Sequence, residues 1–172
     1  MSSQTPSSAR NGPLAPFAGY SSEHRPLSGY ALLAAAFGVA VGGAGMAARA
    51  SGREPPAHWS TRDVLMIGLA THKLSRLIAK DKVTSFLRAP FTEFQEASGQ
   101  GEVEEKPRGK GLQLAIGELA VCPYCLAQWV AAGFVGGMVF APHATRMVAA
   151  VYTAETVADF LQLAYHAGEQ RA

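Results

Sequence analysis

Residues 119–145 read LAVCPYCLAQWVAAGFVGGMVFAPHAT and contain no Asp, Glu, Lys or Arg, although a charged residue stands at each end. Pro123 precedes the most apolar part and Pro142 follows it, as is common near helix ends. About 20 apolar residues in a helix are enough to cross a hydrocarbon core of about 30 Å. The stretch therefore predicts a membrane-spanning helix over about residues 120–141.

A second uncharged stretch, residues 27–48, reads LSGYALLAAAFGVAVGGAGMAA. It predicts an additional N-terminal transmembrane helix, with a cleaved signal peptide as the alternative, supported by the Ala-x-Ala pattern at Ala48 and Ala50. The long polar leader and the length of the run favour an uncleaved helix. The leader, residues 1–26, is rich in Ser, Pro and Gly and lacks periodicity, so it is predicted to be disordered.

Two further segments have helical patterns with charges inside them. Residues 63–80 follow a capping pattern at Ser60 and read DVLMIGLATHKLSRLIAK; residues 147–167 read MVAAVYTAETVADFLQLAYHA. In a soluble bundle these patterns would be ordinary amphipathic helices. Beside two apolar spans, we expect them to be membrane helices whose polar faces point into the bundle. The predicted fold class is an all-α integral membrane bundle with three to four transmembrane helices and a long cytoplasmic loop.

Composition agrees with a membrane protein. Of the 172 residues, 48% are hydrophobic and 16% are charged, whereas a soluble domain has about 25% charged residues. Lys plus Arg (15) nearly balance Asp plus Glu (13), so there is no overall basic field of the kind that nucleic-acid-binding proteins carry. Two cysteines cannot build a disulfide framework. The expected partner is the lipid bilayer, and no nucleic acid is expected.

The distribution of Lys and Arg predicts the orientation, because cytoplasmic loops carry the excess. If all four helices cross, nine of the 15 Lys and Arg fall on the side of both termini and the long loop, and four on the other side. The four are Arg49, Arg53, Arg62 and Arg146. Both termini and the long loop are therefore predicted to be cytoplasmic.

The long loop, residues 81–118, exceeds a simple connection. Residues 82–94 (KVTSFLRAPFTEF) alternate aromatic and cationic side chains and are expected at the membrane surface. Residues 95–111 (QEASGQGEVEEKPRGKG) are charged and rich in Gly, and are expected to be mobile.

Cys122-Pro123-Tyr124-Cys125 stands at the start of the most apolar helix. One interpretation is a structural turn with Pro123 at the first helical position. A second is a thiol redox pair, with Cys122 as the nucleophile and Cys125 as the resolving thiol, because helix N-terminal amides stabilise a thiolate. A third is metal binding, but a closed zinc site needs about four ligands and there is no second Cys pair. No cofactor, metal site or further catalytic residue is assigned, and the predicted cytoplasmic side would keep the thiols reduced.

Two predicted helices carry polar stripes of opposite charge. His72, Arg76 and Lys80 share one face of the first, while Glu155, Asp159, Gln162 and His166 share one face of the second. Unpaired charges are costly in a bilayer, so we expect Arg76 to pair with Glu155 or Asp159 inside the bundle. Such a pair would hold the helices together or form part of a proton or ion pathway.

Small residues recur at helical spacing in the two apolar helices. Gly38 and Gly42, and likewise Gly133 and Gly137, form Gly-xxx-Gly steps, which allow close approach of membrane helices. Packing within one chain and homodimer formation are equally consistent with these steps.

The blocks THKLSRLIAKDKVTSFLRAPF (Thr71–Phe91) and GELAVCPYCLAQWVA (Gly117–Ala131) resemble a bacterial membrane-protein family known only as a domain of unknown function, which includes a sporulation protein. The resemblance covers about residues 63–167. Its motif residues are Arg76, Asp81, Arg88, Glu118, Cys122, Pro123 and Cys125. It implies a location in the inner membrane of a bacterium and a helical architecture, and it brings no reaction, cofactor or catalytic residue.

The sequence thus predicts an uncharacterised membrane protein with a non-enzymatic structural or accessory role. Arg76, Asp81, Arg88 and Glu118 are expected to form a polar network at the membrane surface beside the cysteines. The two alternatives are a membrane thiol oxidoreductase or redox sensor using the Cys pair, and a small transporter or proton-conducting bundle.

Overall fold

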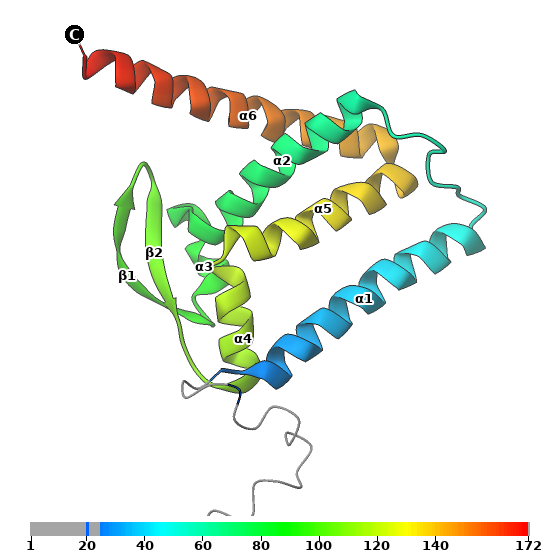
Figure 1. The fold of residues 1–172 in the computed structure, drawn as a ribbon, viewed down its shortest axis with the longest axis horizontal. Coiled ribbons are helices and arrows are strands. Elements are labelled where there is room, and N and C mark those ends of the chain that lie inside the picture. The colour runs from blue at the N-terminus through cyan, green and yellow to red at the C-terminus, as the bar shows by residue number, and fades with distance from the viewer. Residues whose placement is uncertain (1–19, 21–24, 172) are drawn as a thin grey trace, which may run out of the picture.

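The computed structural model describes residues 25–171 together with Tyr20 (Figure 1). The disordered tail predicted for residues 1–26 therefore lies, apart from three residues, outside the described part of the chain. The described residues form α-helices and one two-stranded antiparallel sheet. In chain order the elements are α1 (Leu27–Ala50), α2 (Thr61–Lys80), the 3-10 turn η2 (Lys82–Thr84), α3 (Ser85–Arg88), β1 (Thr92–Gly99), β2 (Glu102–Pro107), α4 (Gly111–Ala120), α5 (Pro123–Phe140) and α6 (Pro142–Glu169).

The long helices begin and end close to where the residue pattern places them. The predicted helices 27–48, 63–80 and 120–141 correspond to α1, α2 and α5. The Ser60 hydroxyl accepts a hydrogen bond from the Asp63 N–H and caps α2 as expected. The fourth helix, predicted over 147–167, corresponds to α6 and is longer at both ends. Its earlier start is possible because Pro142 occupies the first turn, where the missing N–H of proline is tolerated.

The core of the molecule lies where α2 packs against α5 and α6. It consists of Ile67, Ala70, Phe134, Met138 and Ala149. Ala70 and Ala149 are fully buried, so small side chains allow the backbones to approach closely. Hydroxyl groups of α6 add polar links, because Thr153 and Thr156 donate to the Met66 and Leu69 carbonyls of α2 at 2.9 Å each.

Successive long helices along the chain (α1, α2, α5 and α6) run in alternating directions, so their ends gather at two places, while α2 packs parallel to α6 and α1 parallel to α5 (Figure 1). One is the hairpin end, which we define as residues 81–122 with the adjoining ends of α1, α2 and α5. The other is the loop end, residues 51–60 with the opposite helix ends. At the loop end Arg146 binds Asp63 at 3.1 Å and Arg53 donates to the Phe140 carbonyl.

The expected loop 81–118 is instead folded, which corrects the all-α assignment. It contains η2, α3, the β1–β2 hairpin and α4. Gln100 and Gly101 connect the strands with φ values of 53° and 82°, the positive φ that a two-residue hairpin turn requires. Val103 is 3% exposed and anchors β2. Its place between glutamates in Glu-Val-Glu is the alternation of a half-buried strand, which the charged composition of the segment obscured.

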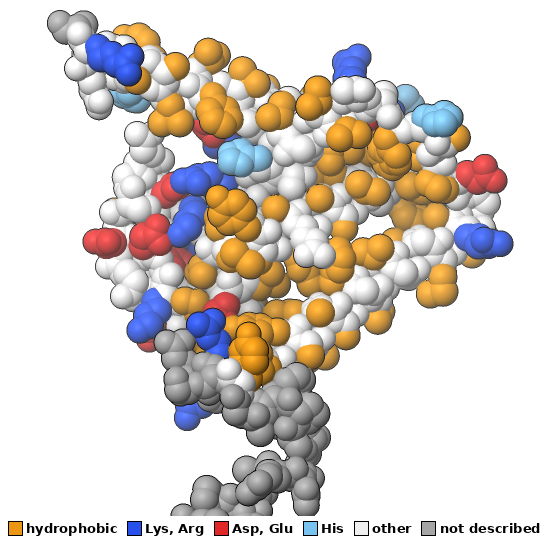
Figure 2. Space-filling model, in the orientation of Figure 1, with side chains coloured by type: hydrophobic (Ala, Val, Ile, Leu, Met, Phe, Trp, Pro, Cys, Tyr) orange, Lys and Arg blue, Asp and Glu red, His pale blue; other side chains and the backbone are white. Residues whose placement is uncertain are grey.

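Two of the described helices, α1 and α5, are long and apolar enough to cross a membrane. The sequence predicted three to four such spans, and α2 and α6 are not among the two. Only 6% of the apolar window of α1 and 11% of that of α5 is buried against the rest of the protein. Figure 2 shows apolar side chains spread over the surface of the helices, while most of the acidic and basic side chains gather at the hairpin end and a few lie at the loop end and at the end of α6.

Candidate functional site

The hairpin end centres on a buried ion pair between α3 and β2. The Arg88 Nε donates to Glu105 Oε2 at 2.7 Å, and Arg88 Nη2 lies 3.3 Å from Oε1, so the guanidinium and carboxylate meet side by side. The two side chains are 1% and 5% exposed. Thr92, at the start of β1, also donates to Glu105 at 3.0 Å. The pair thereby joins α3 to both strands of the hairpin.

Arg88 also completes the C-terminal end of α2. The last carbonyls of a helix have no partner within the helix and need one from elsewhere. Arg88 Nη1 donates to the Ile78 carbonyl at 2.5 Å, and Nη2 donates to the Asp81 carbonyl at 3.0 Å. Thr84 Oγ1 lies 2.6 Å from the Leu77 carbonyl and accepts from Arg88 Nη1 at 2.8 Å. A cation here also complements the negative end of the helix dipole.

The ion pair determines the titration of the Glu105 carboxyl. Burial alone would raise its pKa, but the hydrogen bonds from Arg88 and Thr92 and the guanidinium charge outweigh burial, so the pKa of Glu105 lies below its ordinary value. Glu105 is therefore ionised, as the bidentate contact requires. The opposite holds for Asp81, whose pKa is raised by burial and by nearby carboxylates.

Two exposed ion pairs extend the contact between α2 and β2. Arg76 Nε binds Glu102 Oε1 at 2.6 Å, and Lys80 Nζ binds Glu104 Oε2 at 2.8 Å. Together with Arg88, the cations at the end of α2 and in α3 thus meet the carboxylates of β2. Such surface pairs contribute little energy each, but they fix how the hairpin lies on the helix.

The pairing predicted for Arg76 is wrong. Arg76 binds Glu102, and it is Lys73 that binds the Asp159 carboxylate of α6, at 2.8 Å. Lys73 is not in the predicted stripe of His72, Arg76 and Lys80, so this ion pair with α6 is made from a neighbouring face of α2. Arg76 turns to the hairpin because β2 supplies carboxylates where the sequence suggested a mobile loop.

Exchanging the charges of Lys73 and Asp159 tests this pairing. We expect Lys73→Asp and Asp159→Lys each to lower the free energy of unfolding, and the double variant to recover at least half of the summed loss. The exchange of Arg76 with Asp159 is the control and should show no recovery. The measurement is a double-mutant cycle on thermal unfolding in detergent; recovery for Arg76 but not for Lys73 would contradict the structure.

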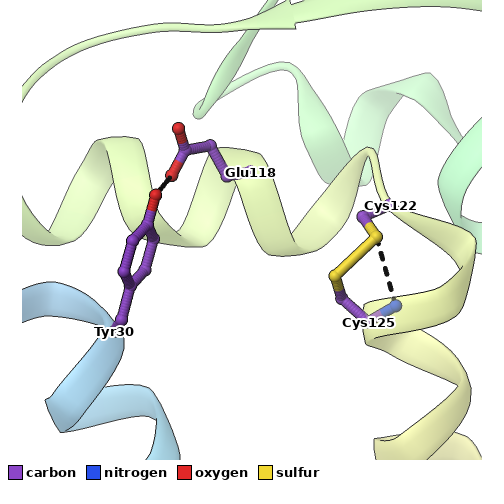
Figure 3. Close-up of a disulfide and its surroundings, with 4 residues drawn as sticks. All are labelled: Tyr30, Glu118, Cys122 and Cys125. Atoms are coloured by element: carbon purple, nitrogen blue, oxygen red, sulfur yellow. Dashed lines mark hydrogen bonds between the residues drawn. A yellow bond between two sulfur atoms is a disulfide. The ribbon is translucent and has the colours of Figure 1, made fainter. Parts of the chain in front are cut away.

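The sequence predicted that Glu118 would join Arg88 in one polar network, but Glu118 is not part of the Arg88 cluster. Glu118, on α4, accepts a hydrogen bond from the Tyr30 hydroxyl of α1 (Figure 3). Asp81 contributes its backbone carbonyl to Arg88. The four residues predicted to form one network therefore take part in two separate sets of contacts. Arg76, Asp81 and Arg88 connect α2, α3 and the hairpin, whereas Glu118 connects α4 to α1.

The two cysteines form a disulfide at the start of α5 (Figure 3). Cys122 is the N-cap residue, and its Sγ accepts a hydrogen bond from the Cys125 N–H at 3.2 Å. Pro123 takes the first helical position, as the structural interpretation predicted. The sequence anticipated a reduced pair, and the structure has the bonded one.

Of the four glycines in the Gly-xxx-Gly steps, only Gly137 lies close to another helix. A Cβ added at Gly38, Gly42 or Gly133 would meet no atom within 4 Å, whereas one at Gly137 would lie 2.6 Å from Thr145 Oγ1. Close approaches also occur outside these steps, at Gly29 against α4 and at Gly117 against the hairpin. The open glycine faces remain a proposed contact for a second copy.

The geometry favours a structural role for these groups. Within residues 25–171 and Tyr20, no group of three or more His, Cys, Asp or Glu could hold a metal ion. The polar atoms of Arg88 are all directed to protein acceptors. Sequence reasoning missed Tyr30, Lys73, Thr84 and Glu105, of which Glu105 alone carried a signal, since it lies in the alternating segment of β2.

Comparisons with known proteins show which family the chain is similar to. The model of the family described as "Protein of unknown function (DUF1360)" matches residues 66–165. The sporulation protein YjcA of Bacillus subtilis (strain 168) is 34% identical over 71 residues, which cover 40% of this chain and 60% of that relative. The chain thus spans about 60% of the length of the curated relative. No solved structure matches. These matches confirm the resemblance to a family of unknown function that includes a sporulation protein.

Proposed function

This chain belongs to the DUF1360 family, and we propose that it is an integral membrane protein with a non-enzymatic structural or accessory role. In this proposal α1 and α5 cross the bilayer, α2 and α6 pack beside them as further membrane helices, and the hairpin end forms a folded cap on the cytoplasmic surface. The polar contacts of that cap hold helices together and leave its outer face for a protein partner.

The observation that carries the proposal is the exposure of large apolar side chains along the helices. On α1, Val39 is 75% and Met46 71% exposed; on α6, Leu161 is 65% exposed. Further exposed members are Leu32, Val41, Val135, Met147, Val151, Phe160 and Leu163. An apolar surface of this extent is unfavourable in water and favourable in hydrocarbon. A bilayer supplies that environment without any further protein.

A cavity of about 980 Å³ between α1 and α5 supports the same proposal. Its lining is apolar or glycine except at the loop end, where Arg49, Arg53 and Glu54 stand. Phe37 of α1 and Trp129 of α5 meet across it with ring centroids 5.1 Å apart. Hydrocarbon chains of lipid fit such a space, with charged groups at the level of the headgroups.

The orientation follows from the Lys and Arg residues. The hairpin end and the two termini carry more of them than the loop end does, and cytoplasmic segments of membrane proteins carry the excess. The transport alternative loses its support, because Arg76 lies at the hairpin end and binds Glu102 there.

Extraction of cell membranes tests the proposal. We expect the protein to remain in the membrane fraction after an alkaline carbonate wash and to leave it only with detergent. Substituting arginine at both Gly133 and Gly136, which border open space in α5, should prevent stable insertion, because charges at mid-membrane are costly. Arginine at Tyr124, at the end of α5, is the control and should be harmless. Release of the wild-type protein into the wash would contradict the proposal.

A further inference from the structure

The disulfide at the start of α5 has two unequal sulfur atoms. Cys125 is an exposed residue and follows Tyr124, which is 90% exposed, whereas Cys122 is half-buried. A thiolate arriving from solution therefore reaches the Cys125 sulfur more readily. Attack at a disulfide also depends on the sulfur that leaves, and a thiol of lower pKa leaves faster.

The structure favours Cys122 as the sulfur that leaves. Its Sγ accepts the Cys125 N–H at 3.2 Å and lies at the N-terminus of an 18-residue helix. Free amide groups and the positive end of the helix dipole stabilise a thiolate at this position. Both the access and the leaving-group preference therefore point to the same direction of attack.

A purely structural role does not account for a disulfide at this position. The two residues are three apart, and the N-cap hydrogen bond and Pro123 at the first helical position already define the turn. A cross-link that closes so short a loop removes little freedom from the unfolded chain. The bond is thus placed at an accessible surface where its loss leaves the helix start intact.

We propose that the Cys122–Cys125 pair is a thiol–disulfide exchange site for a protein dithiol, with Cys125 forming the mixed disulfide and Cys122 leaving as the thiolate. The sequence assigned the nucleophile and the resolving thiol in the opposite order. The order of attack rests on the geometry at the start of α5 and is the same on either side of a membrane.

The partner dithiol supplies both electrons that reduce the Cys122–Cys125 disulfide, so no other reductant is needed. A partner thiolate bonds to Cys125 Sγ as the Cys122–Cys125 bond breaks, and Cys122 leaves as a thiolate that takes up a proton. The second partner thiol, once deprotonated, then attacks the partner sulfur of the mixed disulfide and releases Cys125. The pair is reduced by two electrons, and the partner dithiol becomes a disulfide. In reverse, the Cys122 thiolate attacks the mixed disulfide at Cys125 and releases the partner.

The test uses the full chain in detergent and glutathione as the probe, because a single thiol makes the mixed disulfide persist. Oxidised protein is treated with glutathione, free thiols are blocked with N-ethylmaleimide, and peptide mass spectrometry locates each adduct. We expect glutathione on Cys125 and maleimide on Cys122 in about tenfold excess over the reverse arrangement. Equal or reversed adducts, or a disulfide that reacts only after the protein is unfolded, would overturn the proposal.

The two single-cysteine variants provide a second readout. In Cys125→Ser the remaining Cys122 should react with iodoacetamide with a pKa below that of free cysteine, while in Cys122→Ser the remaining Cys125 should titrate near the ordinary value of about 8.5. Both variants should unfold at the same temperature as the reduced wild type. A Cys122 pKa at or above that of Cys125 would overturn the proposed order of attack.

Discussion

Replacing Arg88 by alanine is expected to lower the free energy of unfolding by about 3–5 kcal/mol, the range for breaking a buried ion pair by removing one partner. The Glu105 carboxylate would stay buried without its cation, and the Ile78 carbonyl would lose its hydrogen bond from Arg88, as would the Asp81 carbonyl, which keeps those from Thr84. The hairpin would then detach from α2 and α3. Thermal unfolding in detergent measures the stability, and limited proteolysis between the strands measures the detachment.

Conservative variants separate the ion pair from general damage. Arg88→Lys keeps the charge but not the planar fork, so it should lose most of the same stability. Replacing Arg88 by Met together with Glu105 by Leu removes both charges and should be less harmful than either single alanine variant. If Arg88→Ala leaves the unfolding temperature and the protease resistance of the hairpin unchanged, the proposed role of this pair is incorrect.

Replacing Gly117 by alanine is expected to destabilise the protein by about 1–3 kcal/mol through overpacking. The added Cβ would lie 2.5 Å from the Phe91 carbonyl oxygen and 3.1 Å from Pro107 Cβ. Both neighbours belong to the base of the hairpin, so neither can move without displacing it. Gly29→Ala should act similarly between α1 and α4, because its Cβ would lie 2.7 Å from Ala115 Cβ.

Gly38→Ala and Gly42→Ala are the matched controls, since both positions are helical and border open space. Alanine is a better helix former than glycine by about 1 kcal/mol, so these variants should be neutral or slightly stabilising. Thermal unfolding of the four variants decides the matter. A loss at Gly38 as large as the loss at Gly117 would show that α1 packs differently from the structure described here.

These contacts also show what the sequence could and could not predict. The long helices were predictable, because uncharged stretches form most of α1 and all of α5, the second followed by Pro142, and α2 is an amphipathic segment capped by Ser60. The hairpin was not, because its glutamates hide a single buried Val103, and a charged segment rich in Gly is usually a loop. The partner of Arg76 is Glu102 of the hairpin, so it could not be predicted once the hairpin was taken for a loop.

The sequence also did not predict which glycines make the close contacts between elements. Gly38 and Gly42 have the spacing typical of helix packing yet border open space, while Gly29 and Gly117 have no such pattern and make the close contacts. Spacing within one helix says nothing about which face another element covers. The Cys pair was predictable as a helix start, whereas the exposure of each sulfur depends on α4 and α5 meeting at that turn.

The most direct test of the account is the accessibility of single cysteines on intact cells. Both native cysteines are replaced by serine, and one cysteine is introduced either at Glu54, in the loop end, or at Ser98, in the hairpin; both positions are exposed. The account predicts that an impermeant maleimide labels the cysteine at position 54 on intact cells and the cysteine at position 98 only after permeabilisation. Labelling of both from the same side, or only of position 98 on intact cells, would contradict it.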